Sequence, residues 1–179
     1  MPLTHAQLLA HWGARRIIYF PLDRFLSRIQ VGPEAFPPDG AIPVEVPILF
    51  TVAVTAPDLE LFSLLNLQLG EDQPTTLIVI GCVPSDPDML FCLDPATGAI
   101  MLLDLDPEHP GYELVNTSFA LFVEFLYRLD ELIQSDPGGE ARADHAAILR
   151  RDLHDLDPDA FEDPESWWSA AFAQLLTST

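Results

Sequence analysis

The sequence contains no lysine. Its eight basic residues are all arginines, against 28 aspartates and glutamates. An enzyme that forms a Schiff base needs a lysine amine, and a P-loop needs a lysine that reaches the phosphates of its nucleotide. Residues 100–104 could otherwise pass for an apolar strand ending in a magnesium-binding aspartate, but neither that lysine nor a glycine-rich loop accompanies them. Pyridoxal-type and P-loop chemistry are therefore excluded.

Cysteines are few, and the apolar stretch near the start of the chain is short. Cys82 and Cys92 both lie in apolar stretches typical of strands. A chain of 179 residues does not need disulfides for stability, so we expect two buried free thiols, as in a reducing compartment. The apolar residues 17–20 are too few for a signal peptide or a membrane span. These observations predict a cytoplasmic protein that does not bind a membrane.

Familiar catalytic and metal-binding motifs are missing as well. The sequence has no GxSxG, GxGxxG or HExxH motif, and none of its five histidines lies two to four residues from a cysteine. Residues 155–159 (DLDPD) resemble the start of an EF-hand, but Ala160 stands where that loop needs glycine and Ser166 where it needs glutamate. We interpret this segment as an acidic helix end. No catalytic residue, cofactor or metal is predicted.

The chain combines a large excess of negative charge with enough apolar residues to form a core. Its formal net charge is −20 and 49% of its residues are hydrophobic, which is unlike a disordered acidic tail. Such a domain repels nucleic acid and anionic membranes, and it attracts basic proteins over about 8 Å at physiological salt. The charge could also serve only solubility, or reflect a salt-rich habitat. Composition alone leaves both interpretations open.

The first half of the chain predicts a helix, a loop and then strands. Thr4 and Gln7 form a capping-box pattern ahead of a helix that ends near Gly13. A strand or helix entry at 16–20, a helix over 23–29 and a proline-rich ordered loop over 31–47 are expected next. The β-branched and apolar runs then predict strands over residues 48–54, 77–82, 90–93 and 99–103, with a hairpin loop at 94–98.

Helices dominate the rest of the chain. Residues 116–118 predict the cap of a helix whose apolar face runs from Phe119 to Ile133. Residues 139–179 are expected to form an acidic helical extension packed on the same domain. We therefore predict one domain over residues 1–179, with an α+β fold: a twisted, mixed, mainly antiparallel β-sheet packed by helices, with a helical C-terminal layer.

Two adjacent tryptophans, Trp167 and Trp168, begin the last predicted helix. Neighbouring residues on a helix point about 100° apart, so both cannot be central on one face. In one interpretation, one ring lies in the core and the other at the edge of the helix packing. In the other, the outer ring, assigned to Trp168, anchors a protein partner, since tryptophan is enriched in such interfaces.

Several short motifs resemble, in their order along the chain, those of the SUKH superfamily. They are residues 40–43 (GAIP), 77–81 (LIVIG), 91–95 (FCLDP), 97–98 (TG), 115–119 (VNTSF) and 122–123 (FV). Within that superfamily the chain is similar to the fourth immunity-protein group, over roughly residues 10–176. The resemblance implies an α+β fold and a bacterial immunity protein that neutralises a cognate polymorphic toxin, often a nuclease or a nucleic-acid deaminase. The matched residues, such as Gly81 at a tight strand exit, are interpreted as fold markers and not as a catalytic set.

Nuclease clefts are basic because they hold phosphates, and an acidic protein can cover such a cleft. We expect the partner to be a basic toxin domain, with no nucleic acid or membrane bound. The candidate partner-binding residues are those of the acidic loops and the outer tryptophan: Asp86, Asp88, Asp104, Asp106, Glu108 and Trp168. Two rival hypotheses remain: an acidic scaffold or regulatory binding protein with several partners, and a small hydrolase whose polar residues converge only in the fold.

Overall fold

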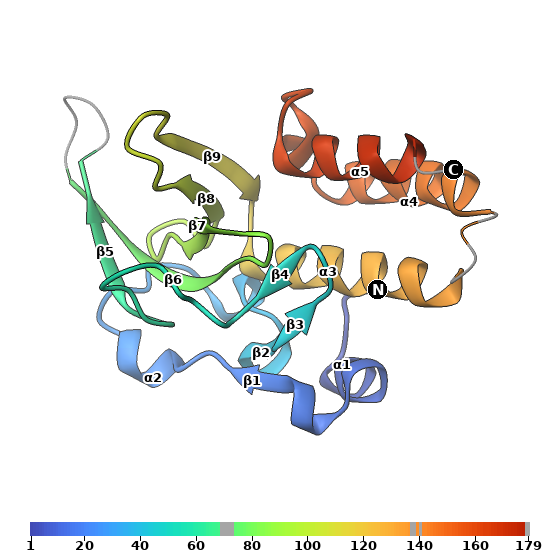
Figure 1. The fold of residues 1–179 in the computed structure, drawn as a ribbon. Helices are drawn as coiled ribbons and strands as arrows, with labels where there is room; N and C mark the ends of the chain where they lie inside the picture. The colour runs from blue at the N-terminus through green and yellow to red at the C-terminus, as the bar shows by residue number, and fades with distance from the viewer. Residues whose placement is uncertain (69–73, 137–138, 140, 178–179) are drawn as a thin grey trace.

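A seven-stranded sheet forms the centre of the computed structural model, which describes residues 1–68, 74–136, 139 and 141–177 (Figure 1). Its strands are β3 (Glu45–Val46), β4 (Phe50–Thr51), β5 (Leu64–Leu67), β6 (Thr75–Val83), β7 (Asp86–Leu93), β8 (Ile100–Asp104) and β9 (Gly111–Asn116). They follow the order β3-β4-β6-β7-β8-β9. One edge of β6 pairs with β7, and the other edge pairs with β5 along the first part of β6 and with β4 near its end. The pairings of the described strands are antiparallel, which confirms the α+β class and the mainly antiparallel sheet.

Helices precede and follow this sheet in the chain. α1 (His5–Trp12), β1 (Ile17–Tyr19), α2 (Leu22–Phe25) and β2 (Ala41–Pro43) come first, and β1 pairs with β2 in a small separate sheet. α3 (Phe119–Ser135), α4 (Arg142–Leu156) and α5 (Trp167–Thr177) follow. Figure 1 shows α4 and α5 side by side as a layer above α3, next to the end of β9. The predicted helical C-terminal layer is confirmed. Within the described residues, no helix has the length and apolar character needed to span a membrane.

The helix starts that were predicted from capping patterns are formed. The Thr4 hydroxyl accepts a hydrogen bond from the Gln7 backbone N–H, and the Gln7 side chain accepts one from the Thr4 backbone N–H at 2.9 Å. The Ser118 hydroxyl accepts from the Leu121 N–H at the start of α3. Gly13 ends α1 with a φ of 81°, a left-handed value that glycine adopts without steric cost. Local sequence therefore determines these boundaries.

The segment from residue 31 to residue 54 differs from the prediction. The expected loop over 31–47 contains β2 and β3, and Pro43 is tolerated in β2 because that strand belongs to a two-stranded sheet and has a free edge. The single strand expected over 48–54 is interrupted, since the chain turns between β3 and β4 at Ile48, whose φ is 73°. A β-branched residue rarely adopts this backbone conformation, so the amino-acid sequence around Ile48 gave no indication of a turn.

The helix predicted over 23–29 is also shorter than expected. α2 has only four residues, and the chain continues as turns in which the N–H groups of Arg28 and Ile29 both donate to the Phe25 carbonyl. Gly81, expected at a strand exit, instead lies within β6. A Cβ at this position would meet the ring of Phe50 and would come within 2.7 Å of the Thr51 carbonyl oxygen. Its role is to admit the close approach of β4.

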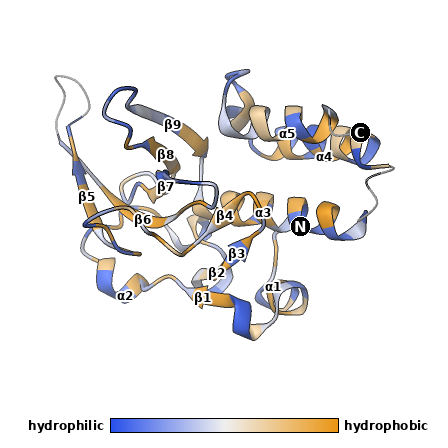
Figure 2. Ribbon diagram, in the orientation of Figure 1, coloured by the Kyte–Doolittle hydropathy of each residue, from blue (hydrophilic) through white to orange (hydrophobic). Residues whose placement is uncertain are grey.

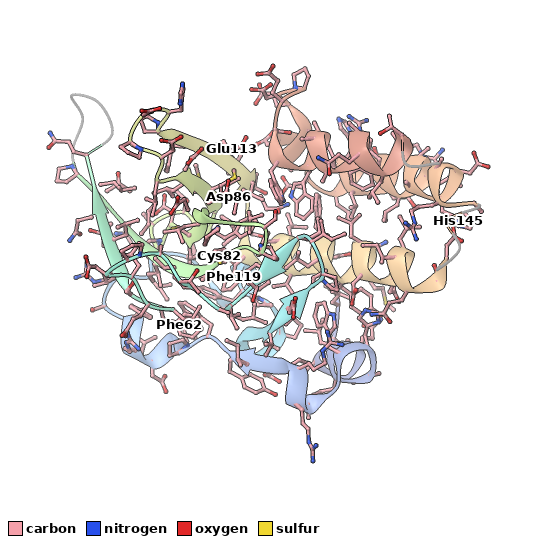
Figure 3. The ribbon with its side chains drawn as sticks, in the orientation of Figure 1. Phe62, Cys82, Asp86, Glu113, Phe119 and His145 are labelled. Atoms are coloured by element: carbon pink, nitrogen blue, oxygen red, sulfur yellow. The ribbon has the colours of Figure 1, made fainter. Side chains whose placement is uncertain are left out.

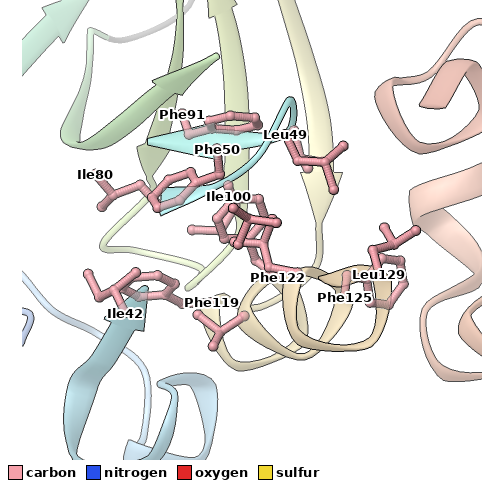
Figure 4. Close-up of a cluster of buried hydrophobic side chains, with 14 of the residues drawn as sticks. Ile42, Leu49, Phe50, Ile80, Phe91, Ile100, Phe119, Phe122, Phe125 and Leu129 are labelled. Atoms are coloured by element: carbon pink, nitrogen blue, oxygen red, sulfur yellow. The ribbon is translucent and has the colours of Figure 1, made fainter. Parts of the chain in front are cut away.

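In the described part of the chain, apolar side chains form two clusters on opposite faces of the sheet. The larger cluster lies between the sheet and the helices, and Figure 4 shows Phe50, Phe91 and Phe122 within it. The smaller cluster, on the other face, includes Leu77, Val79, Leu90, Met101, Leu103 and both cysteines. Alternation along the strands divides the side chains between the two faces. The middle of the sheet is accordingly apolar on both faces, whereas β7 begins and β8 ends with aspartates (Figure 2).

Both cysteines are free and buried, as predicted. Burial raises the pKa of the Cys92 thiol to about 12 and also raises the pKa of the Cys82 thiol. The thiolate is the reactive form of cysteine, so these side chains act as apolar core residues and not as nucleophiles.

Candidate partner-binding site

The five acidic residues expected to bind a partner meet at one end of the sheet, which we call the acidic end. Its members are Asp86 and Asp88 at the start of β7, Asp104 at the end of β8, and Asp106 and Glu108 in the following loop. β7 and β8 are antiparallel, so the start of one lies beside the end of the other. The Leu105 N–H donates to the Asp88 carbonyl at 3.0 Å, which joins the two groups directly. Figure 3 shows Asp86 at the β6–β7 turn.

Two of these carboxylates also shape the loop that carries them. Asp104 Oδ1 accepts a hydrogen bond from the Asp106 N–H, and Asp106 Oδ1 accepts one from the Glu108 N–H, both at 2.9 Å. Such bonds hold the chain in Asx turns. Asp86, Asp88 and Glu108 are the more exposed members of the acidic end. These three are therefore the positions at which charge can be changed with the least effect on structure.

The distribution of arginine leaves the sheet without strong positive charge. All eight arginines lie within residues 15–28 or 128–151, so the sequence from 29 to 127, which includes every strand from β2 to β9, has none. Across the described residues, no arginine forms an ion pair with a member of the acidic end. The loop itself contains one histidine, His109, whose Nδ1 lies 3.7 Å from Asp106 Oδ2. The negative field at this end of the molecule is therefore largely uncompensated.

Trp168 lies in the core, away from the surface. Its side chain is 0% exposed, and its indole N–H donates to Asn116 Oδ1 at 2.9 Å. This burial leaves Trp168 no surface to offer a partner, so the outer position assigned to it belongs instead to Trp167, which is partly exposed. Helical spacing separates the two rings, but the hydrogen bond that Trp168 donates to Asn116 at the end of β9 selects which of them faces inward.

A buried carboxylate, Asp157, links the C-terminal helices to the sheet. It is 2% exposed, and its oxygens accept hydrogen bonds from Asn116 Nδ2 at 2.9 Å and from the N–H and hydroxyl of Thr117 at 3.0 and 2.9 Å. Asn116 in turn accepts from Trp168. The EF-hand-like segment does lie at a helix end, since α4 stops at Leu156. The structural role of Asp157 had no local signal in the sequence, because its partners are 40 and 41 residues away.

A second buried carboxylate, Asp130, holds α1 against α3. Its Oδ2 accepts from Trp12 Nε1 at 2.8 Å and from Gln134 Nε2 at 2.8 Å, and it lies 2.9 Å from His11 Nε2. This is the arrangement closest to a catalytic histidine–aspartate pair. Ser135 lines the same groove between α3 and α4, but its hydroxyl donates to the Leu132 carbonyl at 3.1 Å. The geometry suits the attachment of α1 more than nucleophilic catalysis.

Metal coordination has little support in the described residues, where no group of three or more histidine, cysteine, aspartate or glutamate side chains is placed to hold an ion. The acidic side chains of the acidic end are spread over two loops and partly occupied by backbone N–H groups. The carboxylates of the acidic end can instead attract a positively charged surface.

Glu113, on β9, is a functional candidate that the sequence did not single out (Figure 3). Burial raises the pKa of its carboxyl, and the negative charge of Asp163 raises it further by a smaller amount. A hydrogen bond from the Trp167 backbone N–H lowers the pKa and offsets part of this rise. Asp159, Glu162 and Asp163 line a pocket together with it. Negative charge thus continues from the sheet to the start of α5.

Replacing Glu113 by glutamine is expected to stabilise the chain near pH 7 and to leave stability almost unchanged near pH 4. The carboxyl has a raised pKa in the folded state, so the native chain binds its proton more tightly, and stability falls as pH rises through this range. The amide carries no charge but retains an oxygen for the Trp167 N–H. Thermal melts of both chains from pH 4 to pH 8 measure the effect; an equal melting difference at every pH would contradict it.

Comparison with known proteins gives one result. A family model described as SUKH-4 immunity protein matches residues 3–174 of the chain, from just before α1 into α5. No curated protein and no solved structure matches the chain.

Proposed function

Because the chain belongs to the SUKH-4 immunity protein family, we propose that it binds a basic toxin domain through its acidic end and thereby blocks that toxin's nucleic-acid cleft. The family implies immunity against a toxin. The proposal goes beyond the family in two respects. It assigns the contact surface to the acidic end, and it takes the target to be a nuclease or a nucleic-acid deaminase.

One observation supports the contact surface above all others. Five carboxylates from two neighbouring strands and the loop after β8 meet at one end of a sheet, and the sequence from residue 29 to residue 127 contains no arginine or lysine. A domain that needed charge only for solubility would gain most from a mixed surface. The segregation seen here creates a directional field, and such a field orients an approaching basic partner.

The mechanism follows from the chemistry of nucleic-acid enzymes. Their clefts carry arginine and lysine to neutralise phosphates, and the same side chains can meet carboxylates in place of the substrate. Electrostatic steering raises association rates by about 10- to 1,000-fold, whereas buried contacts determine how long the complex lasts. The bound protein then excludes nucleic acid from the cleft without acting as a catalyst.

Co-expression tests the proposed function. The cognate toxin domain is produced in a host cell with this chain or with an empty vector. We expect growth only with the chain, and recovery of a one-to-one complex from the surviving cells. Growth arrest despite abundant soluble chain would contradict immunity. Survival accompanied by capture of many unrelated basic proteins would instead favour a general acidic scaffold.

A further inference from the structure

An apolar pocket of about 370 Å³ opens beside the acidic end. Its walls come from five parts of the chain that are far apart in the sequence: the β3–β4 turn, the β6–β7 turn with the start of β7, the end of α3, the start of α4 and one face of α5. Prominent among the lining side chains are Ile48, Val83, Met89, Ile133, Trp167 and Leu175. Pockets that hold small-molecule ligands run from about 300 to 1,000 Å³, so this volume lies near the lower end of that range and has room for one large side chain.

Asp86 connects the pocket to the acidic end, because it belongs to both. It is exposed, at the end of the β6–β7 turn where β7 begins. A partner that places an apolar side chain in the pocket therefore brings its neighbouring residues to a carboxylate. Charge complementarity favours a basic residue at that position.

Ile48 is held at this pocket in an unfavourable conformation. Its φ is 73° and its side chain is 71% exposed. Glycine and asparagine adopt this backbone region readily, whereas a β-branched residue is strained there. Neither the core nor a turn requires isoleucine at this position. Strained residues concentrate at functional sites, and here the strain keeps an apolar side chain on the lining of the pocket.

Trp167 contributes a hydrogen-bond donor that has no acceptor among the described residues. The indole N–H groups of the other two tryptophans donate to Asp130 and to Asn116. The buried Nε of Arg142, on the same pocket, also finds no acceptor in the described part of the chain. Unsatisfied buried donors are rare and costly, so these two nitrogens mark the pocket as a place where packing within the described chain is incomplete.

We propose that this pocket receives an anchor from the toxin: one large apolar side chain, followed or preceded by a basic residue that pairs with Asp86. The inference rests on the proposed function for the identity of the partner. The nature of the anchor is inferred from the apolar side chains that line the pocket, from the strained backbone of Ile48 and from the position of Asp86 in both the pocket and the acidic end.

A short peptide tests the chemistry of the pocket without the toxin. The probe is acetyl-Arg-Phe-Arg-amide, added at millimolar concentration to the ¹⁵N-labelled chain, whose three indole N–H signals are assigned with Trp167→Phe and Trp12→Phe variants. We expect the Trp167 signal to move and the Trp12 signal to stay. The matched peptides acetyl-Arg-Ala-Arg-amide and acetyl-Glu-Phe-Glu-amide should move it much less. An unmoved Trp167 signal, or equal movement with all three peptides, would overturn the proposal.

Two matched substitutions on α5 test the pocket against the toxin itself. Ala170 lines the pocket and Ala173 lies one turn further on, away from it, and both are exposed. Methionine is a good helix former, so neither Ala170→Met nor Ala173→Met should unfold the chain. Filling the pocket with Ala170→Met is expected to weaken toxin binding by at least about tenfold, whereas Ala173→Met leaves it unchanged.

Ile48→Asn separates a binding role from a structural one. Asparagine tolerates the left-handed backbone, so the melting temperature should rise, while the loss of an apolar contact should weaken toxin binding. Unchanged binding by both Ile48→Asn and Ala170→Met would overturn the pocket assignment. If the wild-type chain bound and protected in the same assays, the proposed function would still stand; failure of the wild-type chain itself would instead refute that function.

Discussion

Replacing Asp157 by alanine is expected to lower the free energy of unfolding by about 3 kcal/mol, because buried donors of Asn116 and Thr117 lose their acceptor. The effect reaches further than one pair, since Asn116 also orients Trp168. For a chain of this size, such a loss corresponds to a fall in melting temperature of about 6–12 °C. Chemical denaturation followed by tryptophan fluorescence measures the change in stability.

Asp155→Ala is the matched control for this prediction. Asp155 lies two residues earlier, in the last turn of α4, and its side chain is 77% exposed. Its removal should change stability by no more than about 0.5 kcal/mol. Equal stability of the Asp155 and Asp157 variants would show that the buried network does not hold the C-terminal helices to the sheet.

Neutralising the exposed part of the acidic end is expected to slow association with the toxin by about tenfold or more, with little change in the dissociation rate. The variant carries Asp86→Asn, Asp88→Asn and Glu108→Gln. These side chains are exposed, so stability should remain close to that of the wild-type chain. Rapid-mixing kinetics at low salt give both rate constants.

A second variant removes the same number of charges elsewhere. It carries Glu34→Gln, Glu60→Gln and Asp155→Asn, all at exposed positions outside the acidic end. Its net charge equals that of the first variant, so an effect of total charge alone would slow both equally. We expect this control to associate at a rate close to that of the wild-type chain; equal slowing would refute the assignment of the acidic end.

Features that depend on neighbouring residues could be predicted from the sequence. The capping box at Thr4 and the cap at Ser118 determine their helices locally, and the apolar run at 77–82 is central in the sheet as expected. The turn at Ile48 could not be predicted, because its backbone conformation contradicts the preference of its own residue type. The pairing of β3 with β4, in which Val46 lies opposite Phe50, closes the turn around Ile48.

The candidate site was predictable as a set of residues but not as a surface. Asp86 and Asp104 are 18 positions apart, and only the register of β7 with β8 brings their loops together. For Trp168, the sequence predicted that one of two rings is buried but not which one. Spacing on the helix separates it from Trp167, but the choice of the inner ring depends on Asn116, 52 residues away. The pocket beside Asp86 requires five parts of the chain and has no sequence signature at all.

The salt dependence of association with the cognate toxin domain tests the central claim most directly. The Debye length falls from about 30 Å at 0.01 M to about 10 Å at 0.1 M salt, so steering by the acidic end weakens over this range. We expect the association rate constant to fall at least about tenfold while the dissociation rate constant changes little. An association rate constant that does not depend on salt would contradict a toxin-binding surface built on charge.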